Sequence, residues 1–406
     1  MDQHQLRQLA AELVRIPSEN PLDGPVGEGK GEAALAEFVA SYLRDAGVAC
    51  ELRDAVPGRP SVVARVPGAG LPAEALALQT PSQAEEAGPA EAGEEAIWFD
   101  AHLDTVSAVG MEFDPYAARV EGDVLYGRGA SDDKASMAAM MAALIRVAQS
   151  GVRPPADIIF TATADEEYRM RGLHSLLEGG LTARAGIIGE PTGLRVITAH
   201  KGVVRVTITT RGKAAHGSDP DAGVNAIYKM ARVVQALEAY AKGGAGIEAH
   251  PILGRGTLSV GVIRGGEYVN VVPDRCVIEV DRRVLPGEEG RKAVSELRNY
   301  LSNALEDIEA EVSPPTFLVP GLDLSAEHPL AEAAVAAVKQ ITGKASLGGM
   351  AGATHAGPLG RAGIPAVVLG PGAMGQAHTS TERLDLIQLE KAADVYELLM
   401  RNGAMP

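Results

Sequence analysis

Histidine and acidic side chains stand at five places along the chain where an apolar, strand-like run ends or a glycine-rich turn follows it. His102 and Asp104 lie in WFDAHLDTV. Positions i and i+2 of a strand point to the same face, so the Asp104 carboxylate can fix one nitrogen of His102 while the other binds a metal. The alternative is that the two residues are only the polar end of a strand. Asp132 in GRGASDDKAS precedes a helical run, so its carboxylate can bridge two cations or simply cap the helix.

Three acids, Asp165, Glu166 and Glu167, follow directly on the apolar run DIIFTATA. This position corresponds to the carboxyl edge of a sheet, where ligand sites of α/β proteins lie. Without cations the three charges would repel one another and raise their pKa values; the alternative is a solvated loop. Glu190 in GIIGEPT and His378 in GPGAMGQAHTSTERL also follow apolar runs, and each alone would be unremarkable.

Together these residues match the inventory of a two-metal hydrolase. Such a site needs one bridging carboxylate, one histidine and one acid for each ion, and a base for the attacking water. Nitrogen and oxygen ligands without a thiolate favour zinc, with cobalt or manganese as alternatives.

The elements that must position these residues alternate between strands and helices up to residue 195, which predicts an α/β layer sandwich. From about residue 196 the pattern changes to that of a compact α+β module, and helix–strand alternation then resumes. We therefore predict a catalytic domain over 1–195 and 315–406, with a second domain inserted at 196–314. The expected strands of the first part are 61–68, 96–106 and 157–164, and its expected helices are 32–47 and 134–151. The expected helices of the inserted module are 221–242 and 288–310, and its closing strand lies near 311–318.

The segment 68–96 interrupts the first part between two expected strands. It is rich in alanine, glutamate, proline and glycine and lacks β-branched residues except Thr80. This composition is typical of a surface insertion that takes no part in catalysis.

Composition bounds the function further. A chain of 406 residues exceeds what one core usually supports, and its net charge of −16 disfavours binding to phosphate backbones. The two cysteines, Cys50 and Cys276, form no CxxC pair, which favours a reducing compartment. The first residues resemble an amphipathic helix and not a signal peptide, and no run approaches the roughly 20 apolar residues of a membrane span. We expect a cytoplasmic protein that binds neither nucleic acid nor membrane.

The motifs HLDTV, YGRGASDDK, TADEE, GEPT, GKAAHGS and AHTSTE resemble those of the M20 metallopeptidase family, in the same order. That family includes acetylornithine deacetylase, succinyl-diaminopimelate desuccinylase, aminoacylases and carboxypeptidase G-type enzymes. The resemblance covers nearly the whole chain except 68–96. WFDAHLDTV and VDRRVLPGE are also similar to the YgeY-like deacetylase subgroup. The resemblance implies a three-layer, zinc-exopeptidase-like catalytic domain with an inserted α+β, ferredoxin-like lid and dimerisation domain.

The resemblance also implies a role for each residue of the metal site. Asp132 would bridge two ions, with a cis peptide bond after it. Glu166 would be the general base for a metal-bridging hydroxide, and Asp104 would orient His102. The implied metal ligands are His102, Asp132, Glu167, Glu190 and His378.

Relatives bind substrate through residues of the inserted domain, and the matching positions here are His216, Asn270 and Arg283. In dimeric relatives the histidine comes from the partner subunit, so we expect a homodimer formed through this domain. Arginine can bind a carboxylate through two parallel hydrogen bonds, although the neighbouring Arg282 could be the exposed one. The alternative for all three is an ordinary position in a sheet or loop.

The sequence departs from the family at GATHAGPLG. Many relatives have an acid where His355 stands, followed two residues later by an arginine where this chain has glycine. Succinyl-diaminopimelate chemistry is therefore disfavoured. His355 can contact substrate or only pack within its loop.

These features predict a hydrolase that cleaves the amide bond of a small N-acyl amino acid or dipeptide-like substrate with two divalent metal ions. An alternative on the same scaffold is hydrolysis of a carbamoyl or cyclic amide bond. A metal-free binding protein is a third hypothesis, which loss of a ligand or of the base would indicate; every one of these positions is filled.

Overall fold

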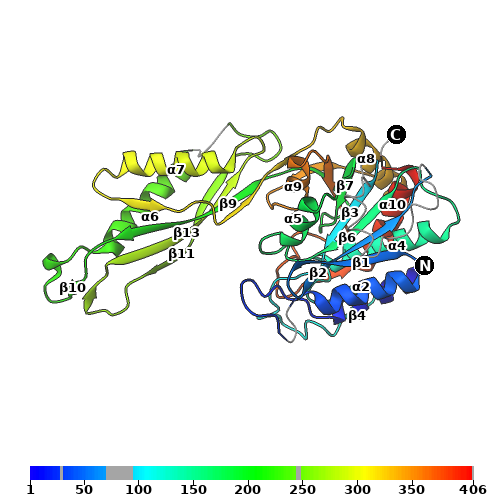
Figure 1. The fold of residues 1–406 in the computed structure, drawn as a ribbon, viewed down its shortest axis with the longest axis horizontal. Coiled ribbons are helices and arrows are strands. Elements are labelled where there is room, and N and C mark those ends of the chain that lie inside the picture. Colours follow the sequence, from blue (N-terminus) through cyan, green and yellow to red (C-terminus); the bar gives the residue numbers. More distant parts are fainter. Residues whose placement is uncertain (28–30, 70–94, 244–247, 405–406) are drawn as a thin grey trace, which may run out of the picture. The chain divides into compact units, whose positions relative to one another are not determined.

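The computed structural model describes residues 1–27, 31–69, 95–243 and 248–404, which form two compact units (Figure 1). The first unit comprises Met1–Thr198, Leu324–Gly348 and Thr354–Pro406, and the second comprises Ala199–Asp323 with Gly349–Ala353. The first division, after Thr198, falls three residues after the predicted boundary at 195, and the second, after Asp323, falls nine residues after the predicted boundary at 314. Most of the expected insertion at 68–96, residues 70–94, lies outside the described residues.

A mixed β-sheet forms the centre of the first unit, with strand order β1-β2-β6-β3-β7-β18-β8. β3 pairs in parallel with β6 and β7, and β7 pairs in parallel with β18. The carboxyl ends of these four strands therefore lie at one edge of the sheet. β2 is antiparallel to both β1 and β6, and β8 is antiparallel to β18. The strands are β1 (Ala49–Val56), β2 (Arg59–Val66), β3 (Ile97–His102), β6 (Ile158–Thr163), β7 (Ala185–Ile188), β18 (Ala366–Val368) and β8 (Val196–His200), and β17 (Leu347–Met350) also pairs with β8.

Helices cover both faces of this sheet, which gives the predicted three-layer α/β fold. Alternate residues of β3 divide between the faces: Ile97, Phe99 and Ala101 join one large aliphatic core, whereas Trp98 and His102 point to the other side. The helices packed in that core are α1 (Gln3–Arg15), α2 (Ala33–Asp45), α4 (Lys134–Gln149), α8 (Pro329–Thr342) and α10 (Leu386–Asn402). The shorter helices α5 (Arg171–Glu178) and α9 (Ala356–Arg361) contact the sheet at β1 and at β7 and β18.

Helix α4 is the central helix of the core. Its alanine, methionine and leucine side chains are buried almost all round, as expected of a helix enclosed by other elements. It begins directly after Asp133, whose side chain makes no capping hydrogen bond. The peptide bond between Asp132 and Asp133 is cis, as the resemblance implies.

The second unit is an antiparallel sheet packed against two helices. Its strand order is β11-β13-β9-β14, with β15 also paired to β9, and β11 is an edge strand among the described residues. Val204, Val206 and Ile278 point to the helices and form a separate core with them. The elements are β9 (Gly202–Arg211), β11 (Thr257–Gly265), β13 (Arg275–Val284), β14 (Ala310–Val312), β15 (Phe317–Val319), α6 (Ala226–Lys242) and α7 (Gly290–Ala304).

Several short elements complete the chain. A three-stranded sheet of order β19-β5-β4 lies in the first unit, and β10 pairs with β12 in the second. Their bounds are β4 (Arg119–Glu121), β5 (Val124–Tyr126), β19 (Arg383–Asp385), β10 (Ala215–His216), β12 (Val271–Val272), β16 (Leu322–Asp323) and the 3₁₀ helix η2 (Pro220–Ala222).

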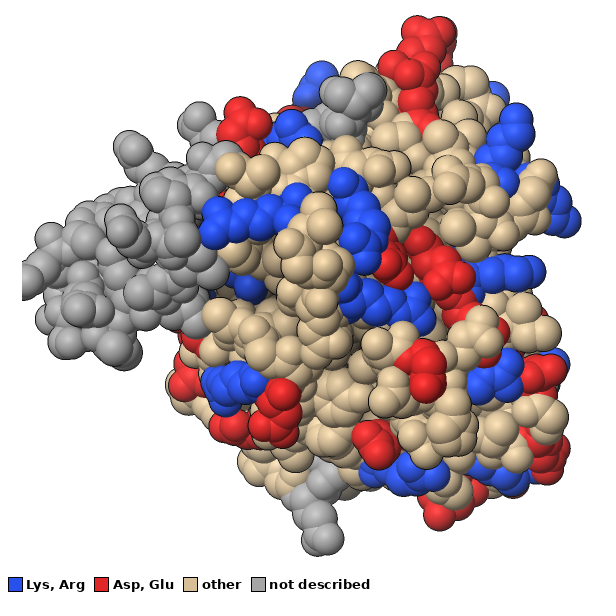
Figure 2. Space-filling view, turned by 90° about the vertical axis from the view of Figure 1, so that its right-hand side faces the viewer, with Lys and Arg blue, Asp and Glu red and all other residues tan. Residues whose placement is uncertain are grey.

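The surface carries both signs of charge. On the face drawn in Figure 2, basic and acidic side chains are interspersed, so the net charge of −16 is not gathered into one acidic area there. Within the described residues, no helix combines the length and apolarity needed to cross a bilayer.

A buried ion-pair network ties β2 to the loop after β6. Arg59 is only 2% exposed. It bonds Glu32 through Nε at 2.7 Å and Nη2 at 2.5 Å, and its Nη1 lies 3.0 Å from Asp165 Oδ1. Arg171 binds Asp165 from the other side, at 2.5 Å. Because both carboxylates are fully buried, they depend on these arginines for charge compensation.

We expect Arg59→Met to lower the free energy of unfolding by about 3–5 kcal/mol, since it leaves buried carboxylates without their cation. Urea titration followed by circular dichroism measures this. The control is Arg53→Met on β1, where the ion pair with Glu51 is 38% and 33% exposed and a change of at most about 1 kcal/mol is expected. Equal losses in the two variants would contradict the network's role.

Candidate metal centre

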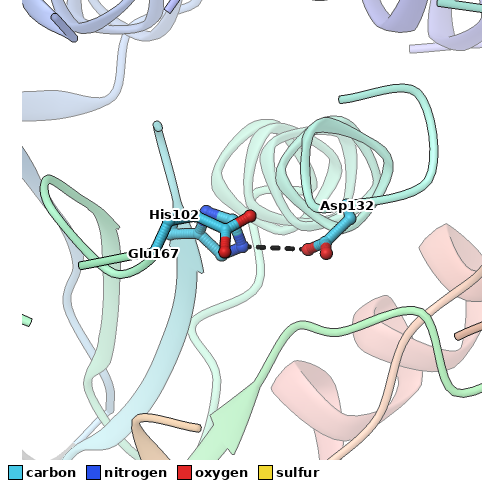
Figure 3. Close-up of side chains that lie close together, drawn as sticks. All are labelled: His102, Asp132 and Glu167. Atoms are coloured by element: carbon cyan, nitrogen blue, oxygen red, sulfur yellow. Dashed lines mark hydrogen bonds and ion pairs between the residues drawn. The ribbon is translucent and has the colours of Figure 1, made fainter. Parts of the chain in front are cut away.

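Six side chains with metal-binding atoms gather at the carboxyl edge of the parallel strands. They come from the end of β3 (His102), the loops after β6 (Glu166, Glu167), β7 (Glu190) and β18 (His378), and the turn before α4 (Asp132). Two overlapping groups have all their ligand atoms within 4.8 Å of one another: His102 with Asp132 and Glu167, and His102 with Glu166 and Glu190. Figure 3 shows the first group, with the His102 ring directed at the Asp132 carboxylate.

Asp132 lies between two imidazoles. Its Oδ1 is 3.0 Å from His102 Nε2, and its Oδ2 is 3.3 Å from His378 Nε2. His378 Nε2 is also 3.0 Å from Glu167 Oε1. Each oxygen of one carboxylate therefore faces a different histidine, which is the arrangement that a bridging ligand needs.

The site is electrostatically unbalanced in the protein alone. Burial and the neighbouring carboxylates raise the pKa of Glu190 well above its usual range, and burial together with Glu167 and Asp104 does the same for the pKa of Glu166, although His102 opposes both shifts. Hydrogen bonds to Asp132 and Glu167 raise the pKa of His378 to about 10. The carboxylates of the cluster are therefore stabilised by a nearby positive charge, either a proton or a cation, as expected of a cation-binding site.

His102 is oriented through its Nδ1, which lies 2.8 Å from the main-chain oxygen of Asp104 and 3.6 Å from its carboxylate. Donation from Nδ1–H to that main-chain oxygen leaves Nε2 free to accept or to ligate. The sequence pattern predicted that the carboxylate of Asp104 would orient His102, and it could not predict the contact with the main-chain oxygen of Asp104.

The Asp104 carboxylate instead holds the loop that carries two of the site's acids. It accepts hydrogen bonds from the backbone N–H groups of Glu166 at 2.9 Å and Glu167 at 3.0 Å, and from Asn20 Nδ2 at 2.6 Å. Asp165, at the start of this loop, has φ +69° and is held by Arg59 and Arg171. The hydrogen bonds to Asp104 and the ion pairs of Asp165 therefore fix the positions of Glu166 and Glu167.

Asn20 and Glu382 were not among the predicted site residues. Asn20 carried no signal, because it stands far from every motif. Glu382 ends the AHTSTE motif, where only His378 was considered. Its buried carboxylate accepts hydrogen bonds from the turn that carries Asp132.

His355 lies in the interior beside β3 and not in the cluster. It is 1% exposed, and its Nδ1 is 2.6 Å from the carboxylate of Asp100, a buried residue two positions before His102. Thr161 donates to the same carboxylate. Contact between His355 and a substrate stays a prediction.

The other three predicted substrate residues belong to the second unit. His216 and Asn270 are neighbours there: His216 pairs with Val271, and Gly217 donates its N–H to the main-chain oxygen of Asn270 at 2.7 Å. Both are exposed.

Arg283 lies on β13, partly exposed, with its Nε 2.6 Å from Asp281 Oδ1. Arg282, its neighbour, points to the helix side and is buried, with its Nη2 2.6 Å from Glu288. Of the two arginines, Arg283 is therefore the accessible one. The substrate roles of His216, Asn270 and Arg283 stay predictions.

Comparisons with known proteins agree with this geometry. Residues 98–402 match the profile of the peptidase family M20/M25/M40. An acetylornithine deacetylase of Vibrio campbellii is 30% identical, with 91% of this chain and 92% of that protein covered.

Among solved structures, aminopeptidase PepT from Bacillus cereus has a TM-score of 0.74 at 22% identity, covering 100% of this chain and 99% of that one. A dinuclear metal-binding peptidase of the M20 family from Bacillus subtilis has a TM-score of 0.68 at 15% identity, covering 98% and 97%. These structures establish the likeness of fold.

The length of the profile match and the near-complete alignment with a curated relative decide the assignment. The chain belongs to the peptidase family M20/M25/M40 and is a hydrolase that acts on amide or peptide C–N bonds.

Proposed function

We propose that this protein is a dinuclear-metal amidohydrolase that removes the acyl group from a small N-acyl amino acid or cleaves a dipeptide-like substrate. One observation carries the proposal: the two oxygens of Asp132 face different imidazoles while three further carboxylates gather around them. The similarity to acetylornithine deacetylases supports the deacylase form of this activity.

The residues present fit two divalent cations. His102 and Glu190 would hold one ion and Glu167 and His378 the other, with Asp132 shared. Within the described chain no lysine or arginine forms an ion pair with Glu166, Glu167 or Glu190, so these acids are available to a metal. Imidazole and carboxylate ligands without a thiolate favour zinc, with cobalt or manganese as alternatives.

Glu166 is the proposed general base. Its carboxyl group belongs to the same cluster as His102 and Glu190, and its main chain is held by Asp104. When bound, the divalent ions lower the pKa of a water and polarise the substrate carbonyl. Glu166 would take the proton from that water at its carboxylate and deliver it to the leaving nitrogen, because one group can act as base and then as acid.

Arg283 is the proposed binding group for a substrate carboxylate, and His216 the proposed stabiliser of the oxyanion. The two are far apart within one chain. His216 lies beyond the Arg275 end of β13, and eight residues at about 3.3 Å each put Arg283 about 26 Å farther along that strand. A small substrate cannot touch both in one protomer, which supports a contribution of His216 from a partner.

The second unit has the features of a dimerisation and lid domain. Its edge strand β11 has no partner on its outer side among the described residues, and several apolar side chains near this edge are exposed, among them Ile263, Tyr268 and Val269. An unpaired edge of this kind can pair with another chain. We therefore propose a homodimer formed through this unit, with the first unit as the catalytic domain.

The two cysteines are both free and buried, which supports the proposal that the protein functions in a reducing compartment such as the cytoplasm.

We expect Glu166→Gln to retain two metal ions per chain while kcat falls by roughly 10²- to 10⁴-fold, because the variant keeps its shape but cannot accept the proton. Elemental analysis and the initial rate with zinc, cobalt or manganese present measure the two quantities. The control is Glu178→Gln at the exposed end of α5, for which activity should equal that of the wild type. A fully active Glu166→Gln enzyme would show that the base is another group.

Mixing two inactive variants tests the contribution of a partner. If His216 acts in trans, His216→Ala and Glu166→Gln are each inactive, but a co-refolded 1:1 mixture forms heterodimers with one complete site. Random association then restores about one quarter of wild-type activity. Absence of recovery, with sedimentation confirming dimers and native mass spectrometry confirming that heterodimers are among them, would show that His216 acts in cis or not at all.

A second candidate function differs in the bond cleaved. The fold also suits hydrolysis of carbamoyl or cyclic amides. A screen of N-acetyl, N-succinyl, dipeptide and N-carbamoyl substrates distinguishes the two functions, because an N-carbamoyl amino acid releases ammonia and carbon dioxide together with the amino acid, whereas the other substrates release no ammonia. Turnover of N-carbamoyl substrates alone would overturn the deacylase proposal.

A further inference from the structure

Glu382 is a fully buried carboxylate that lies directly behind the metal centre. Its Oε1 accepts hydrogen bonds from the backbone N–H groups of Ser131 at 2.9 Å and Asp132 at 3.0 Å. Its Oε2 accepts from the N–H of Gly129 at 3.1 Å and from Arg128 Nη1 at 2.6 Å. All four donors belong to the turn that carries the shared ligand.

The local structure explains how a residue so distant in sequence reaches this turn. β19 pairs with β5 with Arg383 opposite Tyr126, which puts Glu382 beside the start of the turn. Gly127 donates its N–H to the main-chain oxygen of Glu382 at 3.2 Å, so both the main chain and the side chain of Glu382 hold the turn.

The same short segment also carries His378. Asp132 is therefore held at two points by residues four positions apart: its backbone N–H by Glu382 and its carboxylate by His378. Fixing the N–H sets where the Cα and hence the carboxylate lies.

We propose that Glu382 is a positioning residue of the metal centre, whose carboxylate orients Asp132 so that each of its oxygens faces one metal site. This inference rests on the proposed dinuclear centre. Glu382 itself does not ligate in this arrangement, since both its oxygens are occupied by the turn and by Arg128. Its removal would leave buried N–H groups without an acceptor, and the turn would shift to find other partners.

Glu382→Gln is the sharpest variant because it preserves size. A carboxamide has one accepting oxygen and one donating nitrogen, so in either orientation two of the four donors lose their acceptor. We expect zinc affinity, measured by isothermal titration and by equilibrium dialysis, to fall about 10- to 100-fold, as is typical when the groups that orient ligands are changed. The visible spectrum of the cobalt-substituted protein should change as well, because the ligand geometry at the ions differs.

Glu382→Asp is measured in parallel. It keeps the charge but withdraws the carboxylate by one methylene, and weaker zinc binding in the same direction is expected. Either variant, if folded by circular dichroism and binding zinc with wild-type affinity, overturns the proposal.

Asp385→Ala separates positioning from general stability. Asp385 lies three residues away and caps α10 through a hydrogen bond from the N–H of Ile387 at 2.8 Å, and this side-chain hydrogen bond does not involve the turn. Its loss should lower Tm and leave zinc affinity and the cobalt spectrum unchanged, whereas Glu382→Gln should alter both. If Asp385→Ala weakened zinc binding equally, the effect would be one of stability and the proposal would fail. A wild-type protein that binds no zinc would instead refute the dinuclear centre itself.

Discussion

Hydrogen bonds from backbone N–H groups to two buried carboxylates hold the candidate metal centre together. Asp104 accepts from Glu166 and Glu167, and Glu382 accepts from Gly129, Ser131 and Asp132. Both acceptors are fully buried. Hydrogen bonds to an ionised acceptor are shorter and stronger than neutral ones, and they strengthen further in a medium of low dielectric constant. Asp104 and Glu382, which are buried behind the site, therefore hold the backbone of the acids that face it.

This arrangement separates two kinds of acidic side chain. Asp165 and Glu382, behind the site, are each paired with a buried or partly buried arginine, so their charge is compensated within the protein. Glu166, Glu167 and Glu190, which face the site, form no ion pair with an arginine or a lysine among the described residues. Burying several like charges without compensation is costly. The proposed pair of divalent ions would supply that compensation, which would explain why the fold can hold these acids close together.

The parts of this structure that follow from strand and helix periodicity could be predicted from the sequence. DIIFTATA became β6, KASMAAMMAALIRVAQSG became α4, and the strand-end residues His102, Glu166, Glu167, Glu190 and His378 came together with Asp132, because parallel strands end at one edge. Glu382 and Asn20 could not be found in this way. Asn20 donates to the side chain of Asp104, 84 residues away, and no local pattern links the two residues. Glu382 accepts from backbone N–H groups about 250 residues away, and backbone groups leave no trace in a sequence. The main-chain contact of Asp104 with His102 was missed for the same reason.

The proposed roles of His216 and Arg283 depend on a different structural feature from those of the strand-end residues. A strand-end ligand acquires its neighbours as soon as its own sheet forms. Arg283 lies near one end of β13 and His216 lies on β10, beyond the other end, so the distance between them is set by the backbone of the second unit and cannot be closed by rotating side chains. If both act on one substrate, the substrate site is completed only when two chains meet. Affinity between protomers then contributes to catalysis, and the exposed edge of β11 has a functional reason to remain unpaired within a single chain.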